Sequence, residues 1–224
     1  MTADQVAGAA DRLALVQAGL DRACRGAGRP DRPLLVAVSK TFDTDAIRPL
    51  IAAGQRHFGE NRVAETQAKW PALQAETPGI VLHLVGQLQS NKAAEAVAVF
   101  DVIHSVDRPS LVTALAKAQA SAGKHPACYL QVNIGDETQK GGCTLADLPA
   151  LLEQARGAGL DVVGLMCVPP ADVEPAPYFA LLAEHARRLG LAGLSMGMSS
   201  DYETAALLGS TAVRVGSALF GSRG

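Results

Sequence analysis

Short apolar runs alternate with amphipathic stretches along almost the whole chain. Residues 34–38 form an uninterrupted apolar run, which is typical of a strand buried on both faces in a parallel sheet. Similar short segments predict further strands at 57–61, 80–85, 101–104, 127–134, 161–166, 194–195 and 212–215. The stretches between them have apolar residues at helical spacing and predict helices at 46–53, 62–73, 109–122, 145–156, 178–189 and 201–208, with one more that ends at residue 100.

This alternation of strands and helices predicts a parallel α/β fold. Crossover connections are right-handed and eight parallel strands can close on themselves, so we expect a single (β/α)8 TIM barrel. An amphipathic segment at 3–25 predicts an extra N-terminal helix, and no linker or composition break divides residues 1–224, which predicts one domain. A doubly wound open sheet is the alternative. It is disfavoured because the sequence contains neither G-x-G-x-x-G nor G-x-x-x-x-G-K-[ST].

Composition and charge exclude several classes of protein. The chain has 224 residues, of which 48% are hydrophobic, and its formal net charge of −2 gives no attraction to nucleic acid. Acidic and basic residues near the N-terminus, such as Asp4 and Arg12, interrupt any signal-peptide core, and no apolar run approaches membrane length. The four cysteines include no C-x-x-C pair. We therefore expect a cytoplasmic protein that binds neither nucleic acid nor a membrane.

Lys40 follows the first predicted strand almost directly and is the first candidate for chemistry. In parallel barrels the carboxyl ends of the strands are where ligands and catalytic groups gather. A lysine amine at this edge could form a covalent bond with a carbonyl compound. Taken alone, a lysine at a strand end is more often a surface charge whose head stays in water. The predicted barrel changes that balance in favour of a functional role.

The last two predicted strands end in small residues that favour anion binding. Ser199 and Ser200 carry hydroxyls, and the backbone N–H groups of Gly216 and Ser217 are further neutral donors for a phosphate. Ordinary glycine-serine turns are the alternative. Arg214 lies inside the eighth strand, where an inward charge needs a ligand or a carboxylate as acceptor. An outward arginine paired with a helix is equally consistent with the sequence.

Three histidines and an asparagine complete the set of candidates. His57, His83 and His104 fall on three successive strands and suggest a metal site, but no carboxylates at the late strand ends complete it and Arg214 would repel a cation. His83 could pack against a flat ring or be a hydrogen-bonded core histidine. Asn61 could face the same barrel mouth or cap the following helix.

Six segments together resemble the YggS/PROSC family of pyridoxal phosphate homeostasis proteins, which is related to the barrel domain of alanine racemase. They are VAVSKT at 36–41, HFGEN at 57–61, HLVGQLQSNK at 83–92, GLM at 164–166, LSMGMSSD at 194–201 and VRVGS at 213–217. The resemblance implies that pyridoxal 5'-phosphate is the cofactor and that Lys40 forms its internal aldimine. It also implies phosphate binding by Ser199 or Ser200 with Gly216 and Ser217, a contact of Arg214 with the pyridine nitrogen, and a ring lined by Asn61, His83 and Met166.

The same resemblance implies a carrier more than a catalyst. A guanidinium keeps its proton, so a pyridine nitrogen facing Arg214 stays unprotonated and the ring is a weak electron sink. The sequence ends at Gly224, soon after the eighth predicted strand, so we expect no second domain that adds a base. We expect a monomer that buffers pyridoxal 5'-phosphate and passes it to apo-enzymes, with no catalytic residue and no metal. The alternatives are a fold-type III enzyme such as an amino-acid racemase and, third, a metal hydrolase.

Overall fold

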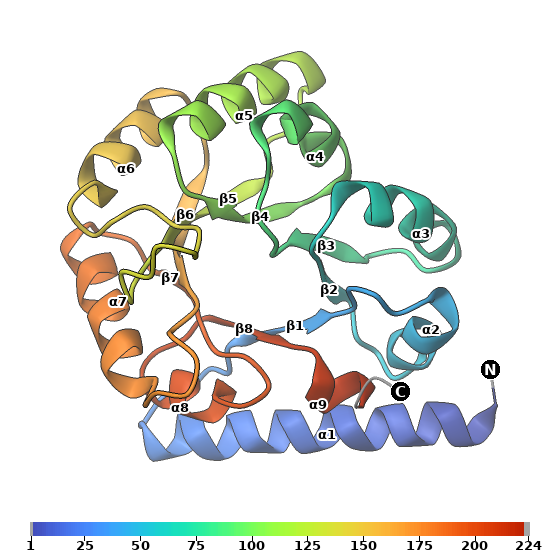
Figure 1. The fold of residues 1–224 in the computed structure, drawn as a ribbon. Helices are drawn as coiled ribbons and strands as arrows, with labels where there is room; N and C mark the ends of the chain where they lie inside the picture. Colours follow the sequence, from blue (N-terminus) through green and yellow to red (C-terminus); the bar gives the residue numbers. More distant parts are fainter. Residues whose placement is uncertain (1, 222–224) are drawn as a thin grey trace.

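Eight parallel strands form a closed barrel in the order of the chain (Figure 1). The structure is a computed structural model and describes residues 2–221. β1 pairs with both β2 and β8, and the pairing of Val36 with Arg214 closes the barrel. The predicted (β/α)8 barrel is therefore confirmed. The strands are β1 Leu34–Val38, β2 His57–Glu60, β3 Val81–Leu84, β4 Val102–Val106, β5 Ala127–Val132, β6 Val162–Cys167, β7 Gly193–Ser195 and β8 Ala212–Val215.

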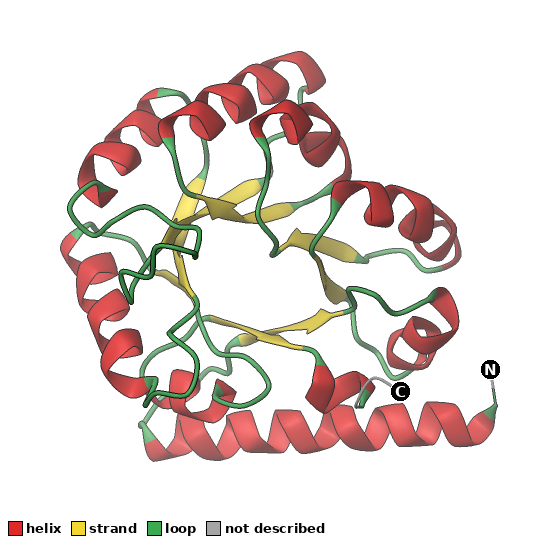
Figure 2. Cartoon of the chain, viewed as in Figure 1, coloured by secondary structure: helices red, strands yellow, loops and turns green. Residues whose placement is uncertain are grey.

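Helices surround the barrel on its outside (Figure 2). They are α2 Thr44–Ala52, α3 Val63–Glu76, η1 Ser90–Lys92, α4 Ala93–Val99, α5 Pro109–Ala122, α6 Leu148–Gly157, α7 Ala176–Arg188, α8 Tyr202–Leu207 and α9 Ser217–Phe220. The predicted N-terminal helix is α1 Ala3–Gly26, which begins with a capping box between Thr2 and Gln5 and packs on α2, α8 and α9. No helix within residues 2–221 has both the length and the apolar content needed to cross a bilayer.

Prolines and capping side chains move several helix boundaries from the predicted positions. α6 begins at Leu148 and not at 145, because Thr144 and Asp147 hydrogen-bond to each other in a turn ahead of it and Pro149 occupies its first turn. α7 begins two residues before the predicted start, with Pro177 in its first turn. A short helix, α9, begins directly after β8 with Gly216 as its N-cap, and its extent could not be read from the sequence because four residues are too few to show helical spacing.

Strand alternation sorts the side chains of the barrel into two sets. Phe58 of β2 points outward, where its ring lies 4.9 Å from that of Trp70 on α3. Its neighbour His57 therefore points into the barrel. The apolar core lies largely between the sheet and the helices, and it includes the fully buried Phe58, Trp70, Phe100 and Phe179. The interior of the barrel is more polar, because His83, His104, Ser195 and Arg214 are all buried there.

Lys69 on α3 clamps the loop that follows β1. Its Nζ donates to the backbone oxygens of Ser39 and Phe42, each at 3.0 Å, and so holds both ends of residues 39–42. The same Nζ lies 2.8 Å from Oε1 of Glu60, which is fully buried. That oxygen also accepts hydrogen bonds from Ser39 Oγ at 2.7 Å and from the indole of Trp70 at 3.0 Å. The loop is thereby fixed to β2 and α3 from behind.

The clamp holds a strained residue. Thr41 has φ of +68°, a left-handed conformation that is unfavourable for a β-branched side chain. Its N–H donates to Oε1 of Glu65 at 2.8 Å, and Glu65 is itself 3.1 Å from Lys69. These bonds keep a backbone shape that the loop would not adopt alone. Lys40 precedes this residue, so the direction of its side chain depends on the clamp.

Replacing Lys69 by Met is expected to destabilise the fold, because it leaves the buried Glu60 carboxylate without its cation. We expect the free energy of unfolding in urea to fall by roughly 3 kcal/mol. The double variant Glu60→Gln/Lys69→Met is expected to recover part of that loss, since it buries no charge. Lys92→Met is the control: it breaks an exposed ion pair with Glu95 and should cost less than about 1 kcal/mol. Equal stability of Lys69→Met and Lys92→Met would contradict the clamp.

Candidate functional site

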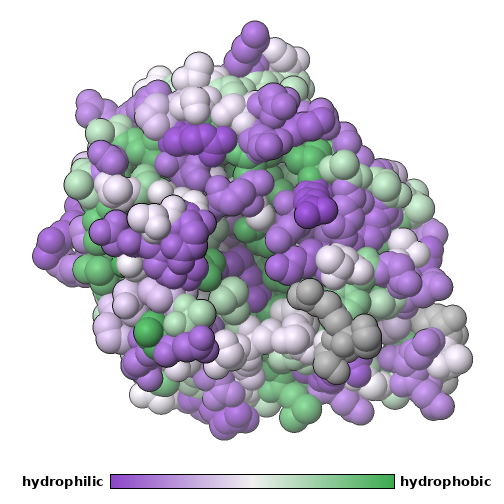
Figure 3. All heavy atoms as spheres, in the orientation of Figure 1, coloured by the Kyte–Doolittle hydropathy of each residue, from purple (hydrophilic) through white to green (hydrophobic). Residues whose placement is uncertain are grey.

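A cavity of about 640 Å³ lies at the carboxyl ends of the strands. This volume is in the range of sites for small ligands. Figure 3 shows the same face of the molecule, hollowed over the centre of the barrel. The walls combine apolar and polar side chains, and they are Val38, Lys40, Phe42, Asn61, Val85, Val168, Met198, Ser199, Ser200, Arg214, Gly216, Ser217 and Gly221.

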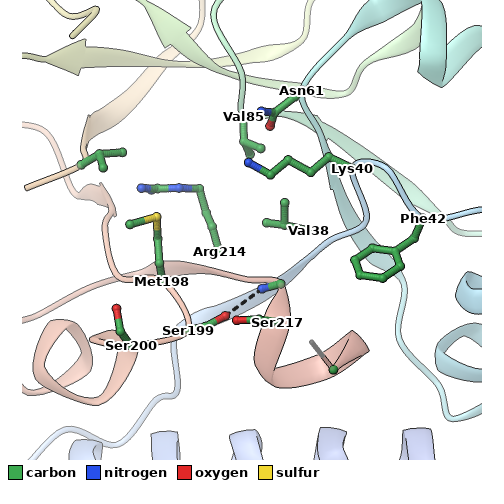
Figure 4. Close-up of a pocket in the computed structure, with 13 residues that line it drawn as sticks. Val38, Lys40, Phe42, Asn61, Val85, Met198, Ser199, Ser200, Arg214 and Ser217 are labelled. Carbon is green, nitrogen blue, oxygen red and sulfur yellow. Dashed lines mark hydrogen bonds between the residues drawn. The ribbon is translucent and has the colours of Figure 1, made fainter. Parts of the chain in front are cut away.

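Lys40 reaches into the cavity from the loop after β1. Val36, Val38 and Lys40 alternate along the chain toward the interior, and the lysine side chain extends across the cavity from the clamped loop (Figure 4). Its half-buried position keeps the amine accessible from the cavity. A primary amine held in this way can attack a carbonyl carbon of a bound ligand.

Arg214 is a buried cation that faces the same cavity. Its side chain rises from the middle of β8 and the residue is only 5% exposed. Nη1 donates to Ser195 Oγ at 2.6 Å and Nη2 to the backbone oxygen of Cys167 at 2.8 Å. Within residues 2–221 no carboxylate pairs with it. Burial lowers the pKa of Arg214, although a guanidinium stays protonated. An unpaired buried cation is costly unless a ligand supplies an acceptor.

Backbone amides at the end of β8 converge on one oxygen. Ser199 Oγ accepts from the N–H of Gly216 at 3.1 Å (Figure 4) and also from the N–H of Ala218 at 3.4 Å. The loop before Ser199 can approach this closely because Gly197 has φ of +96° and a Cβ there would lie 2.6 Å from the Cβ of Ala205. Amides that share an acceptor in this way also suit an oxygen of an anion.

Seven of the nine residues predicted for the site line this one cavity: Lys40, Asn61, Ser199, Ser200, Arg214, Gly216 and Ser217. Met166 lines a neighbouring cavity that shares Asn61, Val85 and Val168 with the first. Asn61 is not a helix cap, because α3 begins at Val63 and Arg62 is its N-cap.

His83 is not among the residues that line the cavity. It is 2% exposed and sits among the interior side chains below the cavity, not in its wall. This differs from the expected position beside a ligand ring. The reason is that β3 ends at Leu84 and Val85 is the next inward residue, so Val85 occupies the wall above the imidazole.

The three histidines form a hydrogen-bonded row. His57 Nδ1 lies 3.1 Å from His83 Nε2, and His83 Nδ1 lies 2.9 Å from His104 Nε2. Ring nitrogens that face each other do not converge on a common point, and the part of the chain that the structure describes contains no group of three or more His, Cys, Asp or Glu side chains placed to hold a metal ion. Burial is the main cause that lowers the pKa of all three: His57 is lowered, His83 falls to about 3, and His104 falls well below its usual range.

Several residues of the site were not anticipated from the sequence. Val38, Val85 and Met198 are apolar walls, and Ser195 and Lys69 act behind the cavity. Val38 shares the inward face of its strand with Lys40, so strand alternation was a signal for it. Lys69 had no such signal, because an isolated lysine on a predicted helix is typical of a solvated surface.

Comparisons with known proteins show what the chain is similar to. The family model for the N-terminal domain of alanine racemase matches residues 20–224. A pyridoxal phosphate homeostasis protein of Pseudomonas aeruginosa is 42% identical over 96% of this chain and 95% of its own length. One of Deinococcus radiodurans is 43% identical over 92% of this chain and 97% of its own length.

Solved structures show the same fold. PipY of Synechococcus elongatus, described with PLP bound, is 40% identical, has a TM-score of 0.82 and covers 95% of this chain and 99% of its own. Alanine racemase of Bartonella henselae has a TM-score of 0.73 at 14% identity and covers 97% of this chain and 61% of its own, a likeness of fold alone. With a matching family model and curated relatives above 40% identity over nearly the full length, the chain belongs to the family of pyridoxal phosphate homeostasis proteins, which share the barrel of the alanine racemase N-terminal domain.

Proposed function

We propose that this protein binds pyridoxal 5'-phosphate in the cavity at the barrel mouth and serves in its intracellular homeostasis. The guanidinium of Arg214, which has no carboxylate partner among residues 2–221, is the observation that carries the proposal, because it faces the cavity that Lys40 also enters. The cofactor offers the matching groups: an aldehyde, a ring nitrogen that accepts a hydrogen bond, and a phosphate. The relative described with PLP bound supports the same ligand.

The lining residues fit the three groups of the cofactor. Lys40 would take the aldehyde, and Arg214 would donate to the ring nitrogen. The phosphate would accept from the Gly216 amide and its neighbours, with the Ser199 hydroxyl beside them. Ser200 and Ser217 line the same end of the cavity, while Asn61 and Val85 lie near Lys40 (Figure 4).

Lys40 would hold the cofactor covalently and reversibly. Its neutral amine would attack the aldehyde carbon, so that a carbon–nitrogen double bond would replace the carbon–oxygen double bond and one water molecule would leave. Addition of water reverses the bond and releases the aldehyde. The cofactor, when bound, supplies this electrophilic carbon and an electron-withdrawing ring. Arg214 keeps its own proton and leaves the ring nitrogen unprotonated, which limits that withdrawal.

The cavity suits a carrier better than a racemase. Among the residues that line it, Lys40 and Arg214 are the titratable ones. Racemisation needs an acid or base on each face of the substrate, and an arginine does not exchange its proton at neutral pH. We therefore propose a monomeric buffer that releases the cofactor to apo-enzymes and has little or no catalysis of its own.

Borohydride reduction tests the covalent bond. Reduction of the protein with pyridoxal 5'-phosphate is expected to add one cofactor to the wild type, on Lys40, and none to Lys40→Ala, because Lys40 is the one lysine among the described residues that line this cavity. Intact mass and peptide mapping measure the label. Lys92→Ala, which removes an exposed lysine, is the control and should label like the wild type. A label of equal yield on Lys40→Ala would show that another residue holds the cofactor.

A racemisation assay separates the two proposed functions. The cofactor-loaded protein is expected to leave the optical activity of alanine, serine and lysine unchanged, because the cavity provides a single exchanging base, Lys40. Polarimetry over many hours measures the rate. If the wild type racemises an amino acid and Lys40→Ala does not, the proposed carrier function is wrong and the protein is an amino-acid racemase.

The two candidate phosphate serines can be distinguished by ligand choice. Ser199→Ala is expected to lower the affinity for pyridoxal 5'-phosphate about tenfold, because it removes one hydrogen bond to a charged group. Pyridoxal, which has no phosphate, should bind both proteins alike. Ser200→Ala is the matched control and should have the smaller effect, since its hydroxyl is not where the Gly216 and Ala218 amides converge. Fluorescence titration measures both affinities, and a larger effect of Ser200→Ala would reverse the assignment.

A further inference from the structure

A continuous hydrogen-bonded chain crosses the barrel interior from β8 to β2. Arg214 Nη1 lies 2.6 Å from Ser195 Oγ, and that oxygen lies 2.7 Å from His104 Nδ1. His104 Nε2 then meets His83 Nδ1 at 2.9 Å, and His83 Nε2 meets His57 Nδ1 at 3.1 Å. All members except the half-buried His57 are buried. The proposed binding of the cofactor uses only the first of these five side chains.

The arginine fixes the direction of every hydrogen bond in the chain. A guanidinium only donates, so Ser195 Oγ accepts from Arg214. The single hydroxyl proton of Ser195 then has one remaining partner among the described residues, His104 Nδ1, which must accept it. His104 is therefore protonated on Nε2 and donates to His83 Nδ1. By the same step His83 is protonated on Nε2 and donates to His57.

The opposite direction leaves a buried group unsatisfied. If His104 donated from Nδ1, Ser195 Oγ would receive two hydrogen bonds and its own proton would have no acceptor among the described residues. A buried hydroxyl without an acceptor is costly. The arrangement that starts at Arg214 gives Ser195 Oγ and both ring nitrogens of His104 and His83 a partner of the right kind, so it is the stable one.

The hydrogen-bonded row of Ser195 and the histidines acts as a neutral acceptor for the buried cation, Arg214. Burial keeps His83 and His104 uncharged at neutral pH, since it lowers the pKa of both rings. Hydrogen bonds that all point the same way polarise one another, which makes Ser195 Oγ a stronger acceptor. A carboxylate at this place would pair with Arg214 and reduce its charge toward the cavity. A neutral chain orients the guanidinium and leaves its positive charge available to a ligand.

We propose that Ser195, His104 and His83 are positioning residues that aim Arg214 at the ring nitrogen of the cofactor through a one-way chain of neutral hydrogen bonds. The proposal rests on the function proposed above. It assigns a role to histidines that are not among the residues lining the cavity. The Cys167 carbonyl fixes the second guanidinium nitrogen, so the two contacts together set the plane of the group.

The proton positions can be measured without any cofactor. In protein labelled with ¹⁵N-histidine, two-bond correlation spectra distinguish a protonated from an unprotonated ring nitrogen. We expect His83 and His104 to be neutral, with protonated Nε2 and unprotonated Nδ1. Signals are assigned from the variants His83→Gln and His104→Gln. A protonated Nδ1 on His104 would reverse the chain and overturn the proposal.

A matched pair of variants at His104 tests the effect on the ligand. His104→Phe keeps an aromatic ring against Tyr129, whose ring is stacked at 4.6 Å, but removes both nitrogens. His104→Gln keeps an acceptor and a donor in the same order. Each variant is titrated with pyridoxal 5'-phosphate and with an analogue in which C–H replaces the ring nitrogen. We expect His104→Phe to lower the affinity for the natural cofactor about tenfold and to leave the affinity for the analogue unchanged. For His104→Gln, both affinities should stay within about threefold of the wild type.

The comparison of the two ligands separates positioning from general damage. Equal weakening of both ligands by His104→Phe, or no weakening of either, would overturn the proposal, because only a contact with the ring nitrogen predicts a difference. If His104→Phe does not fold, Ser195→Ala breaks the same chain with a smaller change and is subject to the same criterion. A wild type that binds neither ligand would refute the proposed function, and with it any role toward a ring nitrogen. The NMR experiment would still show whether the hydrogen bonds from Arg214 to His57 have the proposed direction.

Discussion

A buried guanidinium that has no carboxylate partner in the described part of the chain is the constraint on which the rest of the structure depends. Placing Arg214 inside the barrel removes its charge from water, which is unfavourable unless other groups take its hydrogen bonds. The protein supplies two neutral acceptors, Ser195 Oγ and the Cys167 carbonyl, and leaves the remaining donors toward the cavity. The charge is thus retained for a ligand. A carboxylate partner would have stabilised the folded protein and weakened the site.

This constraint explains why the barrel interior is polar. Most of the bulky apolar side chains pack between the sheet and the helices, while the interior holds a row of three imidazoles and a serine. A row of neutral rings fills space as aromatic side chains do, and the stacking of His104 on Tyr129 adds to this. It also carries hydrogen bonds from one strand to the next. Packing and orientation of the arginine are therefore achieved by the same side chains.

The reactive end of the site is supported from outside the barrel. Lys40 belongs to a loop whose shape is strained at Thr41, and α3 holds that loop through Lys69 and Glu65. The buried Glu60 anchors Lys69 in turn. Two opposite charges thus meet behind the loop, while the amine and the guanidinium in the cavity have no carboxylate beside them in the residues that line it. This division leaves the cavity positively charged and its frame rigid.

The sequence by itself determined the barrel and most of the cavity wall. Apolar runs and helical spacing are local properties, and the rule that strand ends carry the site turned Lys40, Arg214 and the serine loop into one prediction. Tertiary structure decided the rest. His83 can either line a ligand or hydrogen-bond to His57 and His104, and the choice depends on the register of β3 relative to β2 and β4. This register is not encoded by any single strand. The clamp by Lys69 likewise depends on how α3 packs against the loop after β1, because a long flexible side chain chooses its partners only when distant segments come together.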